Sequence, residues 1–245
     1  MKLITHLQQG SIRYFFNNNL SFTVLENPHY RWLNFGHVTQ SIMLKRKPYL
    51  LTLPHQYFIV IPLLFISPNR VIEFGLGGGN LLRFLAHYFP QITYKCIEQS
   101  SDVITCFHRF FNPQHCQYRL HNQSCKQWLH TNTLKEVDWI IYDIYSSENN
   151  DVDLNVIRKM LSELNTNSWL TINIPSDKSR NINHTLQKLN VLKQQRSLVY
   201  FQVPHYKNTI IHLHPKSIST LTQKYIPSYY TKRAINLWQY RCLDR

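Results

Sequence analysis

The chain has 245 residues, of which 43% are hydrophobic and 13% aromatic, which is enough for a buried core and excludes a disordered protein. Its 27 Lys and Arg against 13 Asp and Glu give a net charge of +14. Such a charge favours acidic partners, among them nucleic acid, anionic metabolites and an anionic membrane surface. A basic composition of the source proteome as a whole explains the charge equally well.

Cysteine usage and hydropathy bear on the compartment. The five cysteines form no C-x-x-C pair and are odd in number, which argues against a disulfide framework and against structural zinc. The most apolar run, 57–66, contains Pro62 and is too short to span a bilayer. No segment at the start has the pattern of a cleavable leader. We therefore expect a cytoplasmic protein with no membrane association and no bound metal.

The first 50 residues have the pattern of short strands separated by turns. Segments rich in β-branched and aromatic residues alternate with Asn-, Pro- and Lys-rich pieces typical of turns. The expected strands are 11–16, 20–26, 31–35 and 40–44. We expect this part to form a small N-terminal β-hairpin extension, residues 1–50.

From about residue 51 the pattern changes to alternating helices and strands. Helices are expected at 53–66, 79–89, 100–111 and 152–164. Strands are expected at 69–75, 93–99, 118–122, 137–143 and 168–174. Two further strands, 197–204 and 208–214, read as an antiparallel closing pair. This alternation predicts an α/β fold for 51–245, with a central, mostly parallel sheet and helices on both faces.

Four of the chain's six glycines lie within five positions, in the segment "VIEFGLGGGNLLRFL". They follow a predicted strand and precede a predicted helix. Ligands of parallel α/β sheets bind at this edge, where glycine permits a positive φ and a close approach of the backbone. Glu98 ends the next strand and is well placed to accept hydrogen bonds from two ribose hydroxyls. The segment therefore predicts a nucleoside site.

The glycine spacing favours one kind of nucleoside. A dinucleotide fingerprint needs G-x-G-x-x-G, and here Asn80 stands at the third glycine position. Glu73, two residues before Gly75, fits the E-x-G-x-G opening of class I methyltransferases better. The runs "WLNFGHVTQS", "LPHQYFIVIPLLF", "RVIEFGLGGGNLLRFLAHYFP", "CIEQSSDVI", "VDWIIYDIY" and "WLTINI" resemble, in order and spacing, the spermidine synthase-like branch of the class I methyltransferase superfamily. The resemblance implies a Rossmann-like class I methyltransferase fold.

The resemblance also implies a ligand, S-adenosylmethionine or its decarboxylated form, and roles for individual residues. Asp143, at the end of the fourth strand, falls on the catalytic aspartate of aminopropyltransferases, where a carboxylate could take a proton from an attacking amine or stabilise the sulfonium charge. The implied cofactor-binding residues are Gln40, Glu73, Gly75, Gly77, Gly78, Gly79, Glu98 and Ser124. Spermidine synthases are commonly dimers or tetramers, so a homodimer is possible.

Several acidic positions of the aminopropyltransferases are lost. Gly78 stands where they carry an Asp in the glycine turn, Ser124 and Cys125 where they carry Asp-Gly after the third strand, and Ser146 where they carry a second catalytic-loop Asp. Their polyamine-contacting tyrosine is replaced around His55. A charge-assisted hydrogen bond contributes roughly 1.5–3 kcal/mol, so the losses disfavour a polyamine acceptor. The nearby loop with Glu148, Asp151 and Asp153 could restore acidity or form a solvated turn and helix cap.

Three functional hypotheses follow. The preferred hypothesis is the transfer of a group from a sulfonium cofactor to a small, unknown, non-polyamine acceptor. Methyl is the preferred choice of that group. The second is a polyamine aminopropyltransferase. The third is a non-catalytic protein that binds a nucleoside or nucleic acid through its basic surface.

Two further patterns are read as structural. His212 and His214 share one face of a strand but have no third ligand at metal-site spacing, so we expect a structural pair. The basic residues Lys45–Lys47 and the basic tail could contact phosphates, with Tyr229 and Tyr230 as stacking surface. Those tail residues are Lys232, Arg233, Arg241 and Arg245. No nucleic-acid motif accompanies them, which favours a solvated surface.

Overall fold

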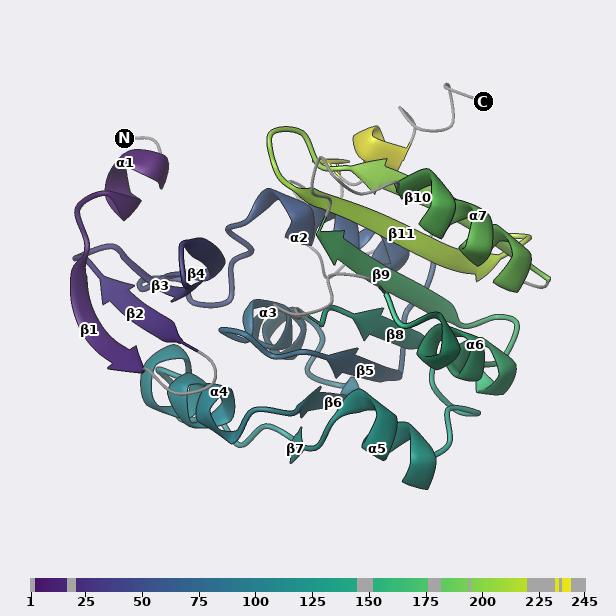
Figure 1. The fold of residues 1–245 in the computed structure, drawn as a ribbon, viewed down its shortest axis with the longest axis horizontal. Coiled ribbons are helices and arrows are strands. Elements are labelled where there is room, and N and C mark those ends of the chain that lie inside the picture. Colours follow the sequence, from purple (N-terminus) through teal and green to yellow (C-terminus); the bar gives the residue numbers. More distant parts are fainter. Residues whose placement is uncertain are drawn as a thin grey trace.

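The computed structural model describes residues 3–16, 21–144, 152–175, 182–193, 195–219, 232–233 and 235–238. Within these ranges the chain forms two β-sheets, a smaller one at the N-terminal side and a larger one flanked by helices (Figure 1). Both sheets agree with the predicted fold class. The boundary after residue 50 stays a prediction.

The N-terminal sheet is antiparallel, with its four described strands in chain order. A short helix, α1 (Leu3–Leu7), precedes it. The strands are β1 (Ser11–Phe16), β2 (Phe22–Glu26), β3 (Tyr30–Phe35) and β4 (Val38–Leu44). This is a larger unit than the hairpin expected from the sequence, although all four predicted strands are confirmed.

The larger sheet has the order β10-β11-β9-β8-β5-β6-β7 over the described residues. Its parallel strands are β5 (Arg70–Phe74), β6 (Thr93–Glu98), β7 (Leu120–Asn122), β8 (Trp139–Tyr142) and β9 (Trp169–Pro175). The antiparallel closing pair is β10 (Arg196–Gln202) and β11 (Asn208–Pro215), as predicted.

Side chains of the central strands alternate between two buried layers. On β8, Trp139 and Ile141 pack into one cluster while Ile140 and Tyr142 pack into another. The first layer lies under α2 (Pro54–Ile59) and α3 (Asn80–Tyr88), and the second under α5 (Cys125–Thr131), α6 (Leu154–Glu163) and α7 (Ile182–Leu192). Because both faces are covered, the strand is apolar at every position.

The N-terminal sheet packs on the larger sheet through a third cluster. Phe22, Leu33 and Met43 from the small sheet meet Leu76 and Leu82 beside the glycine turn. The same cluster contains residues of α4 (Ser101–Cys106) and of the π-helical turn that continues it, Phe107–Phe111. The small sheet is thereby fixed over one end of the large one.

The predicted helix over 53–66 is wrong in its extent. Helix α2 ends at Ile59 and is followed by a 3₁₀ turn, Ile61–Leu64. In a continuous helix the carbonyl of Phe58 would accept from the N–H of Pro62, which proline lacks. His212 Nε2 lies 3.1 Å from that carbonyl oxygen and takes its place as donor.

The same histidine closes a buried hydrogen-bond chain. Trp139 Nε1 donates to Thr171 Oγ1 at 2.9 Å, and Thr171 Oγ1 lies 3.0 Å from His212 Nδ1. With Nε2 donating to Phe58, Nδ1 is the acceptor, so the neutral tautomer satisfies every member. Burial lowers the pKa of His212 to about 3, which keeps the ring neutral. The expectation that His212 and His214 are a structural pair agrees with this arrangement.

Helices α5 and α7 are absent from the sequence expectations. The signal for α5 was present as "SCKQ", because Ser124 and Gln127 form a capping box at its start. Helix α7 follows a stretch outside the described residues, and the helical periodicity of its apolar residues is weak. Both cover the second face of the large sheet.

Candidate active site

A cavity opens at the carboxyl ends of β5, β6 and β8. The turn after β5 supplies Gly75 and Gly77, β6 supplies Glu98, and Asp143 follows β8. Gln40 of β4 reaches the same cavity from the N-terminal sheet. The structure thus brings together these five predicted residues. Glu73, which was also predicted, lines the cavity as well.

The glycine turn needs glycine for two distinct reasons. Gly75 has φ +99°, and a Cβ there would stand 2.1 Å from the backbone oxygen of Asp143. Gly77 has φ +50°, but a Cβ there would meet only Ser41 Oγ, at 3.1 Å. The first glycine therefore permits close contact between two loops, whereas the second mainly permits the left-handed backbone.

The buried side chain of Arg83 holds the glycine turn in place. Its buried guanidinium donates to the carbonyl oxygens of Gly78, of Phe111 at 2.8 Å and of Pro48 at 2.8 Å. Burial lowers the pKa of Arg83 to about 9. One side chain of α3 thus joins the glycine turn, the π-helical turn and the loop after β4.

The N-terminal sheet is bonded to the turn as well. The N–H of Gly78 donates to Ser41 Oγ at 2.8 Å, and Asn80 Nδ2 donates to the carbonyl of Ile42 at 2.7 Å. Gln40 precedes Ser41 on the same strand, so these bonds fix where it meets the cavity.

Glu98 already has two hydrogen-bond donors. Its Oε2 accepts from the N–H of Leu76 at 3.0 Å, and its Oε1 accepts from the N–H of Ser100 at 2.8 Å. A carboxylate has about four acceptor positions, so capacity remains for further donors. Burial raises the pKa of Glu98, while these backbone N–H groups oppose the shift.

Glu73 lies deeper, with 3% of its surface exposed. Burial raises the pKa of its carboxyl to about 8, against a hydrogen bond with the Tyr94 hydroxyl that lowers it. At neutral pH Glu73 is mostly protonated and uncharged.

Asp143 is oriented by a relay of amides. Asn173 Nδ2 donates to Asp143 Oδ1 at 2.8 Å, and Asn208 Nδ2 donates to Asn173 Oδ1 at 2.9 Å. Burial raises the pKa of Asp143 to about 6, and the bond from Asn173 opposes that shift. The relay comes from β9 and β11, and it leaves Oδ2 of Asp143 without a protein donor among the described residues.

His55, at the start of α2, is a cavity residue that the sequence analysis did not count among the site residues. Its Nδ1 is buried without a hydrogen-bond partner among the described residues. Burial lowers the pKa of His55 to about 4, so the ring is neutral at pH 7. A buried polar atom without a partner is costly, which marks this position for a bound group. The sequence signal for His55 was its position, because the resemblance implies a polyamine-contacting tyrosine there.

Not every predicted residue reaches the cavity. Gly79 has φ +63° at the start of α3 and packs against the ring of Phe107, and the N–H of Gly78 is used by Ser41. Ser124 accepts from the N–H of Gln127 and caps α5, whereas its neighbours Gln123 and Cys125 line the cavity.

Other candidates named from the sequence lie elsewhere. Asp153 caps α6 and pairs with Lys126 at 2.8 Å, which agrees with a helix cap. Lys45 pairs with Glu26, and Arg233 lies over the ring of Tyr57. Outside the described residues lie Ser146, Glu148, Asp151, Tyr229, Tyr230, Arg241 and Arg245.

The described residues contain neither a cluster of metal ligands nor a membrane-spanning helix. No group of three or more His, Cys, Asp or Glu side chains there could hold a metal ion. None of the helices in those ranges has the length and apolarity needed to cross a membrane.

The cavity has a distinct charge. Three carboxyl groups line it, from Glu73, Glu98 and Asp143, and no Lys or Arg of the described residues does so. An unpaired anion would be poorly held there, whereas a cationic or polar ligand with hydroxyl groups suits the cavity.

The chain has a fold of the class I methyltransferase type. It is similar to human methyltransferase-like protein 13 in complex with SAH, at 15% identity and a TM-score of 0.58, over 78% of this chain and 92% of that one. No protein-family model and no curated protein matches the sequence.

Within that class the chain has the fold of spermidine synthases. It is similar to a probable spermidine synthase from Corynebacterium glutamicum, at 12% identity and a TM-score of 0.68, covering 93% of this chain and 94% of that one. Spermidine synthase from Thermotoga maritima gives 12% identity and a TM-score of 0.63, over 92% of this chain and 87% of that one. The predicted resemblance is confirmed at the level of the fold, which is all that identities this low establish.

Proposed function

We propose that the protein is a transferase that uses S-adenosylmethionine or its decarboxylated form. It transfers a group, with methyl as the preferred choice, to a small non-polyamine acceptor. The observation that carries the proposal is the cavity itself. It lies at the carboxyl ends of the central strands, beside a glycine turn, with carboxyl groups and no Lys or Arg among its described lining. A sulfonium nucleoside is a cation with ribose hydroxyls, so its chemistry matches that lining.

The residues present fit such a ligand. Gly75 and Gly77 leave the backbone of the turn accessible, and Glu98 has the capacity to accept from ribose hydroxyls. Gln40 and Gln123 offer amide groups at the cavity wall. When bound, the sulfonium would supply an electrophilic carbon.

Asp143 and His55 would act on the acceptor. At pH 7 Asp143 is mostly ionised but has a raised pKa, so it can accept a proton from the acceptor. Asn173 holds one of its oxygens and thereby fixes the direction of the other. His55 would give the acceptor a hydrogen-bond partner, and the enzyme's remaining task is to hold the acceptor in line.

A polyamine aminopropyltransferase is the second candidate. One structural neighbour is a spermidine synthase in complex with the transition-state analogue AdoDATO, and this ligand is a property of that protein. The carboxyl groups of this cavity would also suit a cationic amine. Against it stand the replaced acidic positions and the neutral His55 at the start of α2.

The third candidate is a protein that has the fold without the catalysis. It is the non-catalytic protein that binds a nucleoside or nucleic acid, and salt-sensitive retention of nucleic acid without binding of a sulfonium nucleoside would support it.

We propose a cytoplasmic location, in accord with the sequence argument against a disulfide framework. Cys96, Cys106, Cys116 and Cys125 are all free in the structure.

A calorimetric titration tests the proposal and separates the candidates. The ligands are S-adenosylmethionine, its decarboxylated form and methylthioadenosine, each against the native protein and against Asp143→Asn. We expect S-adenosylmethionine to bind, and Asp143→Asn to retain nucleoside binding while it loses transfer. Preference for the decarboxylated form would favour aminopropyl transfer, and no binding of any ligand would refute both enzymes.

A further inference from the structure

The open edge of the large sheet carries a cluster of basic side chains. Strand β7 is the outermost strand there, and among the described strands it pairs only with β6. The N–H of Cys96 donates to the carbonyl of Arg119 at 3.0 Å, which sets Lys95 of β6 beside Arg119. His121 follows on β7 opposite Ile97, and the nearby charge of Lys95 adds to burial in lowering its pKa. Lys126 and His130 are exposed on α5, the next element. We call these five residues the basic edge.

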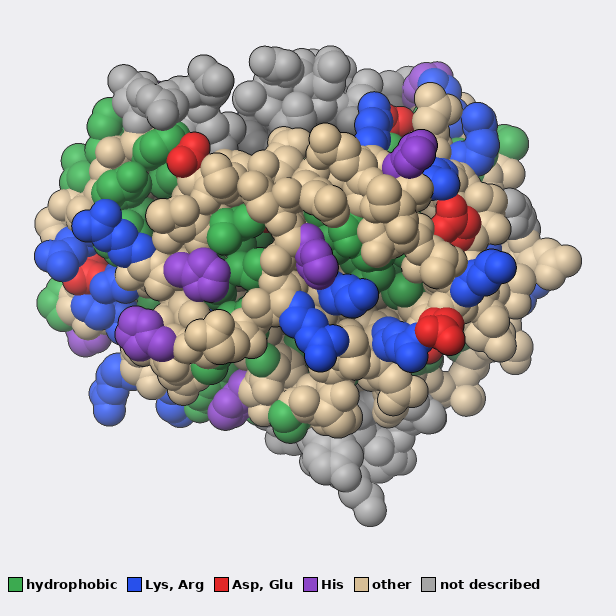
Figure 2. Space-filling view, turned by 90° about the horizontal axis from the view of Figure 1, so that it is seen from below, with side chains coloured by type: hydrophobic (Ala, Val, Ile, Leu, Met, Phe, Trp, Pro, Cys, Tyr) green, Lys and Arg blue, Asp and Glu red, His purple; other side chains and the backbone are tan. Residues whose placement is uncertain are grey.

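The protein neutralises the basic edge only in part, at Lys126. Over the described residues no ion pair involves Lys95 or Arg119, and Asp153 pairs with Lys126 alone. Figure 2 views the molecule from the side of β7 and α5, and Lys, Arg and His side chains lie together near the middle of that face, with no acidic side chain between them. Like charges held together without counter-charges repel one another, so an anion bound there would relieve that repulsion.

A shallow, open groove lies beside these charges. Its walls are the end of β7 and the exposed side of α5, and they hold amide, hydroxyl, ammonium and imidazole groups without any apolar side chain. The lining residues are Asn122, Gln123, Lys126, Gln127, His130 and Thr131. A membrane surface is bound by basic residues together with apolar anchors, which this groove lacks. Phosphates next to cations, and base edges next to amides, match it better.

We propose that the groove and the basic edge bind single-stranded nucleic acid. Lys95 and Arg119 contact backbone phosphates, while the amides of the groove meet base edges that are accessible only in an unpaired strand. Gln123 lines both this groove and the cavity at the carboxyl ends of the strands, so a bound strand lies next to that cavity. The inference needs no sulfonium ligand and stands apart from the proposed function.

Fluorescence anisotropy with a labelled single-stranded RNA of about 16 nucleotides tests this. Affinity is measured between about 50 and 200 mM salt, because each phosphate contact adds about 0.7 to the slope of log affinity against log salt for single strands. For the double variant Lys95→Gln/Arg119→Gln we expect weaker binding and a slope reduced by about 1.4.

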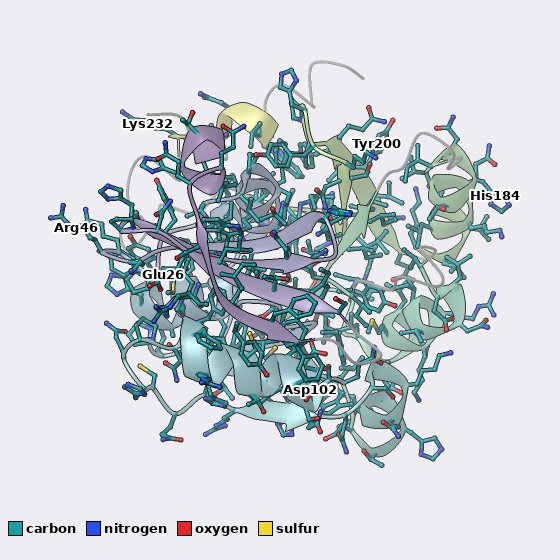
Figure 3. All side chains as sticks on the ribbon, turned by 60° about the vertical axis from the view of Figure 1, so that its left-hand side comes forward. Glu26, Arg46, Asp102, His184, Tyr200 and Lys232 are labelled. Atoms are coloured by element: carbon teal, nitrogen blue, oxygen red, sulfur yellow. The ribbon has the colours of Figure 1, made fainter. Side chains whose placement is uncertain are left out.

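The matched control is Arg46→Gln/Lys47→Gln, which removes the same charge from two exposed residues at the end of β4. Figure 3 labels Arg46 on the N-terminal sheet, away from β7. The control is expected to keep the native slope. Equal losses in both variants would overturn the proposal, because only net charge would then matter.

Two other outcomes would also overturn it. One is no RNA binding by the native protein at about 50 mM salt. The other is binding to phosphatidylserine-containing vesicles without binding to RNA, which would assign the surface to membranes. Because Lys95 lies on a strand, thermal melts accompany the assay. If the double variant is unfolded, the single variant at exposed Arg119, Arg119→Gln, decides with an expected slope change of about 0.7.

Discussion

The three carboxyl groups at the cavity have different surroundings, and different hydrogen bonds oppose the rise that burial causes in the pKa of each. Glu98 accepts two backbone N–H groups, Asp143 accepts one side-chain amide, and Glu73 is enclosed with the Tyr94 hydroxyl. The sequence could name all three, because each lies at or near the end of a predicted strand. It could not give their protonation, which depends on burial and on partners from distant strands. For the same reason it missed Arg83, whose three backbone acceptors come from three separate segments of the chain.

At the residue scale, Glu73 predicts a dependence of stability on pH. Its pKa is about 8 in the folded protein against 4.5 for the free side chain, so the folded state holds the proton over that interval and the unfolded state releases it. The contribution of Glu73 to the free energy of unfolding is therefore largest below pH 4.5 and falls until about pH 8, at about 1.4 kcal/mol per pH unit at most.

Urea unfolding at several pH values from 5 to 8 measures this, with Glu73→Gln as the variant that cannot titrate. We expect the variant to lose less stability than the native protein as pH rises. Glu26→Gln is the control, because the ion pair with Arg31 lowers the pKa of Glu26 against burial. Glu26 therefore stays ionised from pH 5 to 8, and its removal should leave the shape of the pH profile unchanged. A native protein and Glu73→Gln with parallel pH profiles would contradict the assignment.

At the scale of elements, strands were predicted better than helices. The strands of both sheets are apolar or alternate clearly, and each one named from the sequence exists within a few residues. Helix 53–66 was too long because Pro62 ends the hydrogen bonding of α2, and the substitute donor, His212, lies far along the chain. Helix α5 was missed although Ser124 and Gln127 cap it, because Ser124 had been considered only as a ligand residue.

The glycine turn predicts a difference between two similar substitutions. Gly77→Ala places an alanine in the left-handed conformation with little steric conflict, which costs about 1–2 kcal/mol of stability. Gly75→Ala adds a Cβ 2.1 Å from the Asp143 backbone oxygen, so the turn or the loop after β8 must move. We expect a loss at least twice as large, measured by chemical unfolding. Equal losses would mean that the two loops do not meet as described.

At the scale of the whole molecule, the N-terminal sheet and the large sheet form the cavity together. Gln40 lines the cavity and Ser41 bonds the glycine turn, and both come from β4. The sequence predicted this contribution for Gln40 through the resemblance, and the packing of Phe22, Leu33 and Met43 on the turn explains it physically. The homodimer stays a prediction, which a measurement of mass in solution tests.

The central claim is that the cavity holds a sulfonium-type nucleoside through Glu98. A thermal-shift titration with S-adenosylmethionine, on the native protein and on Glu98→Gln, tests it most directly. Because a ligand that binds only the folded state raises stability with its concentration, the native melting temperature should rise steadily, and Glu98→Gln should need higher concentrations for the same rise. A native protein whose melting temperature does not change at any concentration would contradict the account.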